Sequence, residues 1–104
     1  MASTRLEILK SMVAQKPGDS FLPYGLAMEY RNAGDLSSAV HEFQGLVAAD
    51  PDYAAAYFQA GQTLLKLGKP EEARALYISG IEVTTRQGNE HARSELQGAL
   101  DLLG

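Results

Sequence analysis

The sequence repeats itself after 34 residues, and this period limits the possible folds more than any other feature. A fixed period of about 20–50 residues indicates similar supersecondary units stacked on one another. Adding 34 to a residue number brings together positions of similar size and polarity across the middle of the chain. The matched positions are Leu26-Ala27 and Ala60-Gly61, Tyr30 and Leu64, Gly34 and Gly68, Ala39 and Ala73, Phe43 and Tyr77, and Val47 and Ile81.

Each unit is predicted to be two helices joined by a short turn. Gly34 and Gly68 can adopt the left-handed conformation that ends a helix, Asp35 can cap the next helix, and Pro70 suits a first helical position. Apolar residues recur at spacings of three and four, which is typical of helices, and no segment alternates as a strand would. These residues are Leu22, Leu26, Tyr30, Leu36, Ala39, Val40, Phe43, Val47, Tyr57, Ala60, Leu64 and Leu67.

The boundaries of the units are predicted by proline and by capping residues. Pro51 lacks an N–H group and disfavours helix at the residue before it, so the second helix of the first unit should end there, with Asp52 available to cap the next helix. A half repeat is expected before the first unit, because Pro17 stands 34 residues before Pro51. At the other end, Asn89 can cap a final amphipathic helix.

Small residues occur where two antiparallel helices must approach closely. They are Ala27, Ala39, Gly61 and Ala73. A glycine inside a helix costs about 0.5–1 kcal/mol relative to alanine, so Gly61 indicates close packing that compensates for this cost. We therefore expect a bulky residue at Gly61 to overpack the helix pair.

Together, the small residues, the aromatic residues Phe43 and Tyr77 and the following Pro51 resemble the tetratricopeptide repeat signature over about residues 20–85. The resemblance implies an all-α fold of antiparallel helix-turn-helix repeats in a right-handed superhelical stack, with about six helices. Two positions depart from the family pattern. Pro23 stands where an aromatic residue is common, and Thr85 replaces a proline, so the helix after Pro70 is expected to run longer.

The chain is expected to form a single domain over residues 1–104, because domains most often contain about 100–150 residues. Its expected parts are a half-repeat helix over 3–16, a first repeat over 20–52, a second repeat over 53–87 and a capping helix over 89–103. Two full repeats are fewer than the three that an isolated stack usually needs. The flanking helices are expected to supply the missing interfaces.

Composition excludes several classes of function. The net charge of −4 and the pI near 5.0 leave no positive excess for phosphates, so nucleic acid is not an expected partner. No apolar run is long enough for a secretion signal or a membrane span, so neither export nor a membrane partner is indicated. The absence of cysteine is compatible with the cytoplasm, which is the expected location.

The sequence contains no convincing catalytic or metal-binding motif. His41 and His91 stand alone, without a second ligand at zinc-binding spacing, and are interpreted as surface residues. Glu71 and Glu72 follow Pro70 at a helix start, where they oppose the helix dipole, and adjacent residues point in different directions around a helix. We therefore expect no enzyme, no metal and no cofactor.

The resemblance implies that a partner binds in the concave groove lined by the first helix of each pair. Two interpretations of the groove residues stay open: they complete the core, or they form an exposed patch for a partner's apolar side chains. Lysines and asparagines that would clamp an acidic chaperone tail are missing, so an apolar or amphipathic segment is the expected ligand. The groove residues are Phe21, Tyr24, Met28, Ala55, Phe58, Gln59 and Gln62.

Three hypotheses for function follow. The first is an adaptor or scaffold that binds another protein or peptide in this groove. The second is a homodimer, or another homo-oligomeric assembly, that closes the same groove on a second copy. The third and lowest-ranked hypothesis is a small hydrolase or metal enzyme, which would need partners near His41 or His91 that the sequence does not place there.

Overall fold

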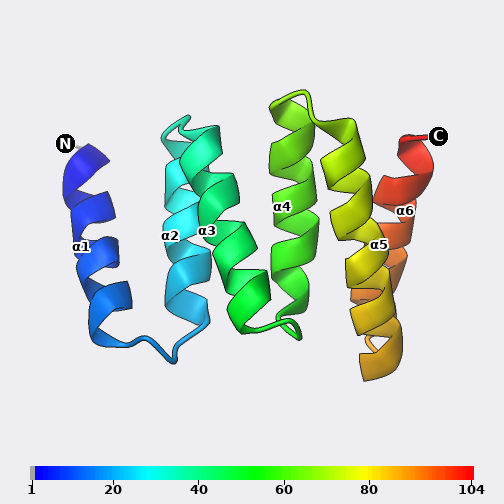
Figure 1. Cartoon of the computed structure of the whole chain (residues 1–104), viewed down its shortest axis with the longest axis horizontal. Coiled ribbons are helices and arrows are strands. Elements are labelled where there is room, and N and C mark those ends of the chain that lie inside the picture. The colour runs from blue at the N-terminus through cyan, green and yellow to red at the C-terminus, as the bar shows by residue number, and fades with distance from the viewer. Residues whose placement is uncertain (1) are drawn as a thin grey trace.

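The computed structural model describes residues 2–104, with side chains from Arg5 onward, and over this range it contains six helices and no strand. The predicted all-α fold is therefore confirmed. The helices follow one another across the molecule in chain order, and its dimensions are 39 × 28 × 19 Å (Figure 1). They are α1 (Ala2–Gln15), α2 (Phe21–Asn32), α3 (Leu36–Ala49), α4 (Ala54–Lys66), α5 (Pro70–Gln87) and α6 (Glu90–Leu102).

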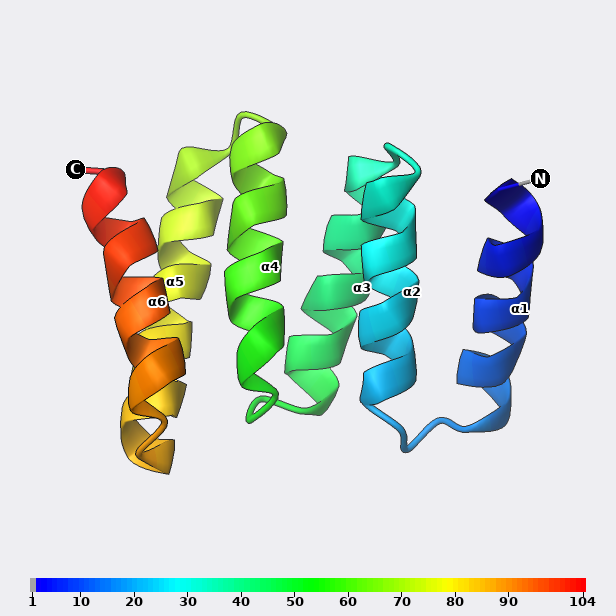
Figure 2. The ribbon, with the colours of Figure 1, turned by 180° about the vertical axis from the view of Figure 1, so that it is seen from behind.

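The helices form a layered stack in which each helix packs on the next one in the chain, and α4 also contacts α6. In Figure 1, α3 lies in front of α2 and α5 lies in front of α6; the view from behind in Figure 2 reverses this order. The first helices of the pairs thus form one layer, and the second helices form the other. None of the described helices combines the length and the apolar character that crossing a membrane requires.

The turns form where glycine and the capping residues predicted them. Gly34 and Gly68 have φ angles of +86° and +75°, in the left-handed region that favours glycine. The side chain of Asp35 accepts a hydrogen bond from the Ser38 backbone N–H at 3.1 Å, which caps α3. Pro70 is the first residue of α5. These local signals were sufficient to place the turns within the two repeats.

The prediction that Asp52 caps α4 is wrong. The residue before α4 is Tyr53, which makes no side-chain capping bond. The Asp52 carboxylate instead accepts a hydrogen bond from Arg86 Nη1 at 3.0 Å. The Asp52 side chain therefore pairs with a residue 34 positions later in the sequence instead of capping the nearby helix.

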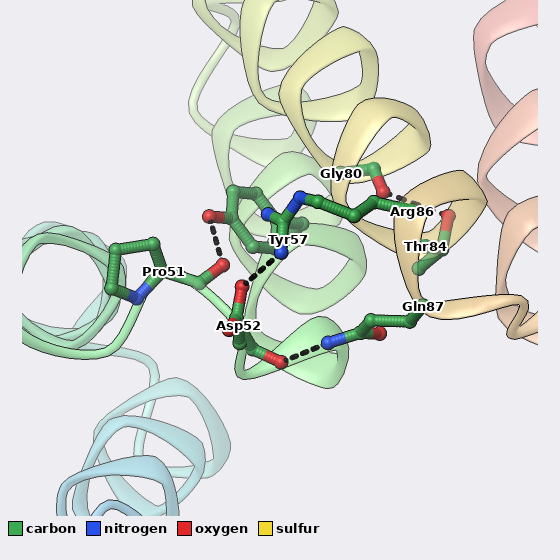
Figure 3. A network of polar contacts seen from close by, with 7 residues as sticks. All are labelled: Pro51, Asp52, Tyr57, Gly80, Thr84, Arg86 and Gln87. Carbon is green, nitrogen blue, oxygen red and sulfur yellow. Dashed lines mark hydrogen bonds and ion pairs between the residues drawn. The ribbon is translucent and has the colours of Figure 1, made fainter.

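The last turn of α5 binds the turn between the two repeats, which is drawn in Figure 3. Besides the contact from Arg86, Gln87 Nε2 donates to the Asp52 carbonyl at 2.8 Å, and the Tyr57 hydroxyl donates to the Pro51 carbonyl at 2.6 Å. No proline ends the helix at Thr85, and α5 continues for 18 residues until Gly88 takes a φ of +69°. The longer helix expected from the missing proline is confirmed, and its extra turn links the repeats.

The core depends on close helix contacts at small residues. Ala27, Ala39 and Ala73 have no solvent exposure, and Gly61 is buried against the ring of Tyr77. A Cβ atom added at Gly61 would lie only 2.7 Å from Tyr77 Cζ. The close approach expected from a glycine inside α4 is confirmed.

Asn89→Ala is expected to lower the free energy of unfolding by about 0.5–2 kcal/mol, because it removes a helix cap. The Asn89 side chain accepts a hydrogen bond from the Ala92 backbone N–H at 3.2 Å, at the start of α6. Urea denaturation followed by circular dichroism measures the change. Asn32→Ala, at the exposed last residue of α2, is the matched control and should stay within about 0.5 kcal/mol of wild type. Equal losses in both variants would contradict the capping role.

Candidate protein-interaction face

The seven residues predicted to line the groove lie on α2 and α4, in the layer that Figure 2 turns toward the viewer. Spacings of three and four residues place the members from each helix on one side of that helix. We call this set the α2–α4 face. It consists of Phe21, Tyr24 and Met28 on α2 and Ala55, Phe58, Gln59 and Gln62 on α4.

Phe21 is the most exposed aromatic residue of the α2–α4 face. It is the first residue of α2, and 69% of its surface is accessible to solvent. Ala55, near the start of α4, is also exposed. Phe21 therefore keeps most of its apolar surface in contact with solvent and does not gain the free energy of burial.

Tyr24 is half-buried and belongs partly to the core. Its ring meets the buried Phe43 edge-on, with ring centroids 6.0 Å apart, and lies against Tyr53 at 5.4 Å. Burial raises the pKa of the Tyr24 hydroxyl, while the nearby charge of Arg31 and an interaction with the Gln59 side chain act in the opposite direction. Tyr24 is therefore partly exposed to solvent and partly packed against aromatic residues of the core.

Phe58 and Met28 have a similar intermediate position. Phe58 is half-buried, and its ring lies 6.4 Å from that of Tyr77. Met28 packs against the core cluster that contains Phe43. Exposure therefore differs from residue to residue: Phe21 and Ala55 are exposed, whereas Tyr24, Met28 and Phe58 are half-buried at the edge of the core.

The two glutamines of the α2–α4 face differ in their contacts. Gln59 accepts a hydrogen bond from Arg31 Nη1, which connects α4 to α2. Gln62 is half-buried one turn further along α4. Arg31 was not included among the predicted groove residues. Its place seven residues after Tyr24, on the same side of α2, was a signal in the sequence that could have found it.

A buried hydroxyl lies beneath the α2–α4 face. Tyr77 has no solvent exposure, and no group in the part of the chain that the structure describes forms a hydrogen bond with its hydroxyl. Burial raises the pKa of this hydroxyl, and the charge of Arg31 partly opposes that effect. Buried hydroxyl groups without a partner are rare in native proteins, so this one is a feature that requires a physical explanation.

The candidate catalytic residues are scattered on the surface. His41 and His91 are exposed, as predicted. Glu71 forms an ion pair with Arg74 at 3.5 Å, and the Glu72 carboxylate lies 3.9 Å from the Lys69 ammonium group. Among the side chains from Arg5 to Gly104, no three histidine or acidic residues gather in a way that could hold a metal ion.

Two surface hollows lie away from the α2–α4 face. One, of about 250 Å³, lies beside α3 and the turn before α5 and includes Val40 and His41. The other, of about 190 Å³, lies where α1 meets α2 and α3 and includes Val13 and Leu46. Neither of these two hollows includes a residue of the α2–α4 face.

Comparison with known proteins finds proteins that are similar to this chain in sequence and in structure. Residues 24–80 match the family model described as "Tetratricopeptide repeat". A tetratricopeptide repeat domain protein from Salinibacter ruber, solved by NMR, is 36% identical and superimposes with a TM-score of 0.80, covering 84% of this chain and 88% of that chain. An uncharacterised protein of Methanocaldococcus jannaschii is 33% identical over 60 residues, which are 58% of this chain and 70% of that protein.

A third similarity concerns the fold alone. The type III secretion chaperone SycD of Yersinia enterocolitica, solved in complex with a peptide of the translocator YopD, superimposes with a TM-score of 0.87 at 16% identity. The match covers 98% of this chain and 79% of SycD. SycD has also been crystallised as an alternative dimer, with a TM-score of 0.86 and coverage of 98% and 78%.

Proposed function

We propose, since this chain belongs to the tetratricopeptide repeat family, that it is a protein-interaction adaptor which binds a segment of a partner protein on the α2–α4 face. The observation that carries the proposal is the exposed Phe21, which continues into the half-buried Tyr24 and Met28 along one side of α2. Exposed apolar surface of this kind is typical of interaction sites. The adaptor has no chemistry of its own.

The similarity to SycD supports the proposal at the level of the fold. SycD was solved with a translocator peptide, so a chain that folds in this way can accommodate a segment of another protein. The partner segment here is apolar or amphipathic. Its apolar side chains cover Phe21 and the exposed edges of Tyr24 and Met28, and the amide of Gln62 contacts its backbone.

Phe21→Ala is expected to reduce partner affinity by at least about tenfold, because it removes a large aromatic anchor from the binding surface. The free energy of unfolding should change by no more than about 0.5 kcal/mol, because the side chain is exposed in the free protein. Peptides selected from a random display library against the wild-type protein serve as ligands. Fluorescence anisotropy with the labelled peptides measures the affinity.

Ile78→Ala is the matched control for Phe21→Ala. Ile78 is also exposed, at 44%, but it lies on α5 in the other layer. Its replacement should leave the affinity unchanged. Equal losses in both variants, or no loss in Phe21→Ala, would contradict binding on the α2–α4 face. Tyr24→Ala and Phe58→Ala are less informative, because both side chains also support the core.

A second candidate function is self-assembly, which the dimeric form of SycD favours, and we place it on the α2–α4 face because Phe21 is exposed there. Light scattering over a range of protein concentrations separates the two candidates. A dimer that Phe21→Ala dissociates would support self-assembly. A monomer at every concentration would leave the α2–α4 face available to a different protein.

A further inference from the structure

Arg31 differs from the other arginines of the chain in its partners. Arg5, Arg74, Arg86 and Arg93 each form an ion pair with an aspartate or glutamate. Arg31 is half-buried, and within the part of the chain whose side chains the structure describes, no carboxylate oxygen lies within 4.0 Å of it. Its hydrogen-bond partner is the neutral amide of Gln59. Arg31 therefore keeps a positive charge that no side chain neutralises at close range.

The polar side chains near Arg31 are neutral: one amide and two tyrosine hydroxyls. The amide oxygen of Gln59 accepts a bond from Arg31, and the Gln59 side chain also interacts with the Tyr24 hydroxyl. The Tyr77 hydroxyl lies beneath the face, fully buried and out of reach of a ligand on the surface, and Tyr24 lies about two turns before Arg31 on the same side of α2. A guanidinium group whose only neighbours of this kind are neutral suits an anionic ligand group. The charge of Glu95 on α6 acts on the Tyr24 hydroxyl, and among the described side chains Glu95 forms no ion pair with Arg31.

A half-buried guanidinium group loses hydration, and a carboxylate restores the lost interactions better than a neutral group does. Two parallel N–H···O bonds between arginine and a carboxylate are stronger and more directional than a bond to an amide. A partner with a carboxylate at this position would therefore complement the charge of Arg31, which lies beside the α2–α4 face. A purely apolar partner would cover Arg31 without satisfying it.

We propose that the partner segment carries an aspartate or glutamate that pairs with Arg31, flanked by apolar side chains that pack on Phe21, Tyr24 and Met28. This inference rests on the proposed function and specifies its ligand. Its basis is charge complementarity between Arg31, which lacks a carboxylate partner, and an acidic side chain of the segment. The acidic residue supplies selectivity, and the apolar residues supply most of the buried area.

The test uses display-selected peptides of about 12 residues, which in extended form can span the 39 Å length of the molecule. Each aspartate or glutamate of a selected peptide is replaced in turn by asparagine or glutamine. At one acidic position, we expect this replacement to lower the affinity of the peptide for the wild-type protein at least about tenfold. The same replacement should lower the affinity of the peptide for the Arg31→Gln variant less than about twofold. Arg74→Gln is the matched control, because it removes the same charge from α5, and it should behave as wild type.

A second measurement needs no variant, and it keeps the inference testable if Arg31→Gln unfolds. The pKa of the peptide carboxyl group is measured by NMR with the peptide free and bound to the wild-type protein. Pairing with Arg31 should lower this pKa by at least about one unit on binding, because the charged form binds more tightly. An unchanged or raised pKa would contradict the pairing.

The remaining outcomes separate this inference from the proposed function. In one outcome, the peptides bind and Phe21→Ala lowers their affinity, but their acidic residues contribute equally to binding wild type and Arg31→Gln. This outcome would overturn the acidic requirement alone. Selection of no peptide, together with a dimer in light scattering, would overturn both proposals and indicate a second copy as the occupant.

Discussion

Replacing Gly61 with alanine is expected to destabilise the protein by about 1–3 kcal/mol, although alanine favours helix more than glycine does. A Cβ atom at this position would lie 2.7 Å from Tyr77 Cζ and 2.9 Å from Tyr77 Cδ1. The Tyr77 ring is fully buried, so it cannot move away without disturbing its neighbours. Urea denaturation followed by circular dichroism measures the loss, and leucine at this position should cost at least as much.

Gly45→Ala is the matched control for Gly61→Ala. Gly45 lies inside α3, is exposed, and has no atom within 4 Å of where its Cβ would be. The same substitution should therefore stabilise the protein by about 0.5–1 kcal/mol, because only the helix propensity changes. If Gly61→Ala were as stable as Gly45→Ala, the close contact between α4 and α5 would be refuted.

Leu96→Ala is expected to cost about 2–5 kcal/mol, because it leaves a cavity in the core. Leu96 lies on α6, is 1% exposed, and belongs to the same core cluster as Tyr57 and Tyr77. Its Cδ1 atom would lie 2.9 Å from a Cβ added at Gly80, so α6 packs tightly on α5. The loss would show that the final helix completes the core of the second repeat.

Leu102→Ala, on the same helix, is the control for Leu96→Ala. Leu102 is 90% exposed, and its replacement should change the free energy of unfolding by no more than about 0.5 kcal/mol. Similar small losses in both variants would mean that α6 does not belong to the cooperative unit. Denaturation curves of the two variants and wild type, measured under identical conditions, make the comparison.

The fold was largely predictable because its signals are local or periodic. Gly34 and Gly68 end helices through their own backbone conformation, and the small residues recur with the period of the stack. The role of Asp52 was not predictable from local rules, because Arg86 reaches it from the end of α5. Capping rules describe a helix end in isolation, whereas the folded chain offers additional partners.

The candidate site was predictable only in outline. Helical spacing placed its members on one side of each helix, but exposure depends on neighbours that are distant in the sequence. Tyr24 is half-buried because it packs on Phe43 and Tyr53, and Phe58 is half-buried close to Tyr77. The spacing of Arg31 was visible in the sequence, whereas its lack of a carboxylate partner emerges only from the packed structure.

The central claim is that a partner segment binds on the α2–α4 face, and NMR mapping of a bound peptide tests it most directly. Backbone amide signals of ¹⁵N-labelled protein are recorded during titration with a display-selected peptide. We expect the largest chemical-shift changes on α2 and α4, around Phe21, Met28 and Gln62, with little change on α3 and α5. Changes confined to α3 and α5 would place the binding site on the opposite layer and contradict the claim.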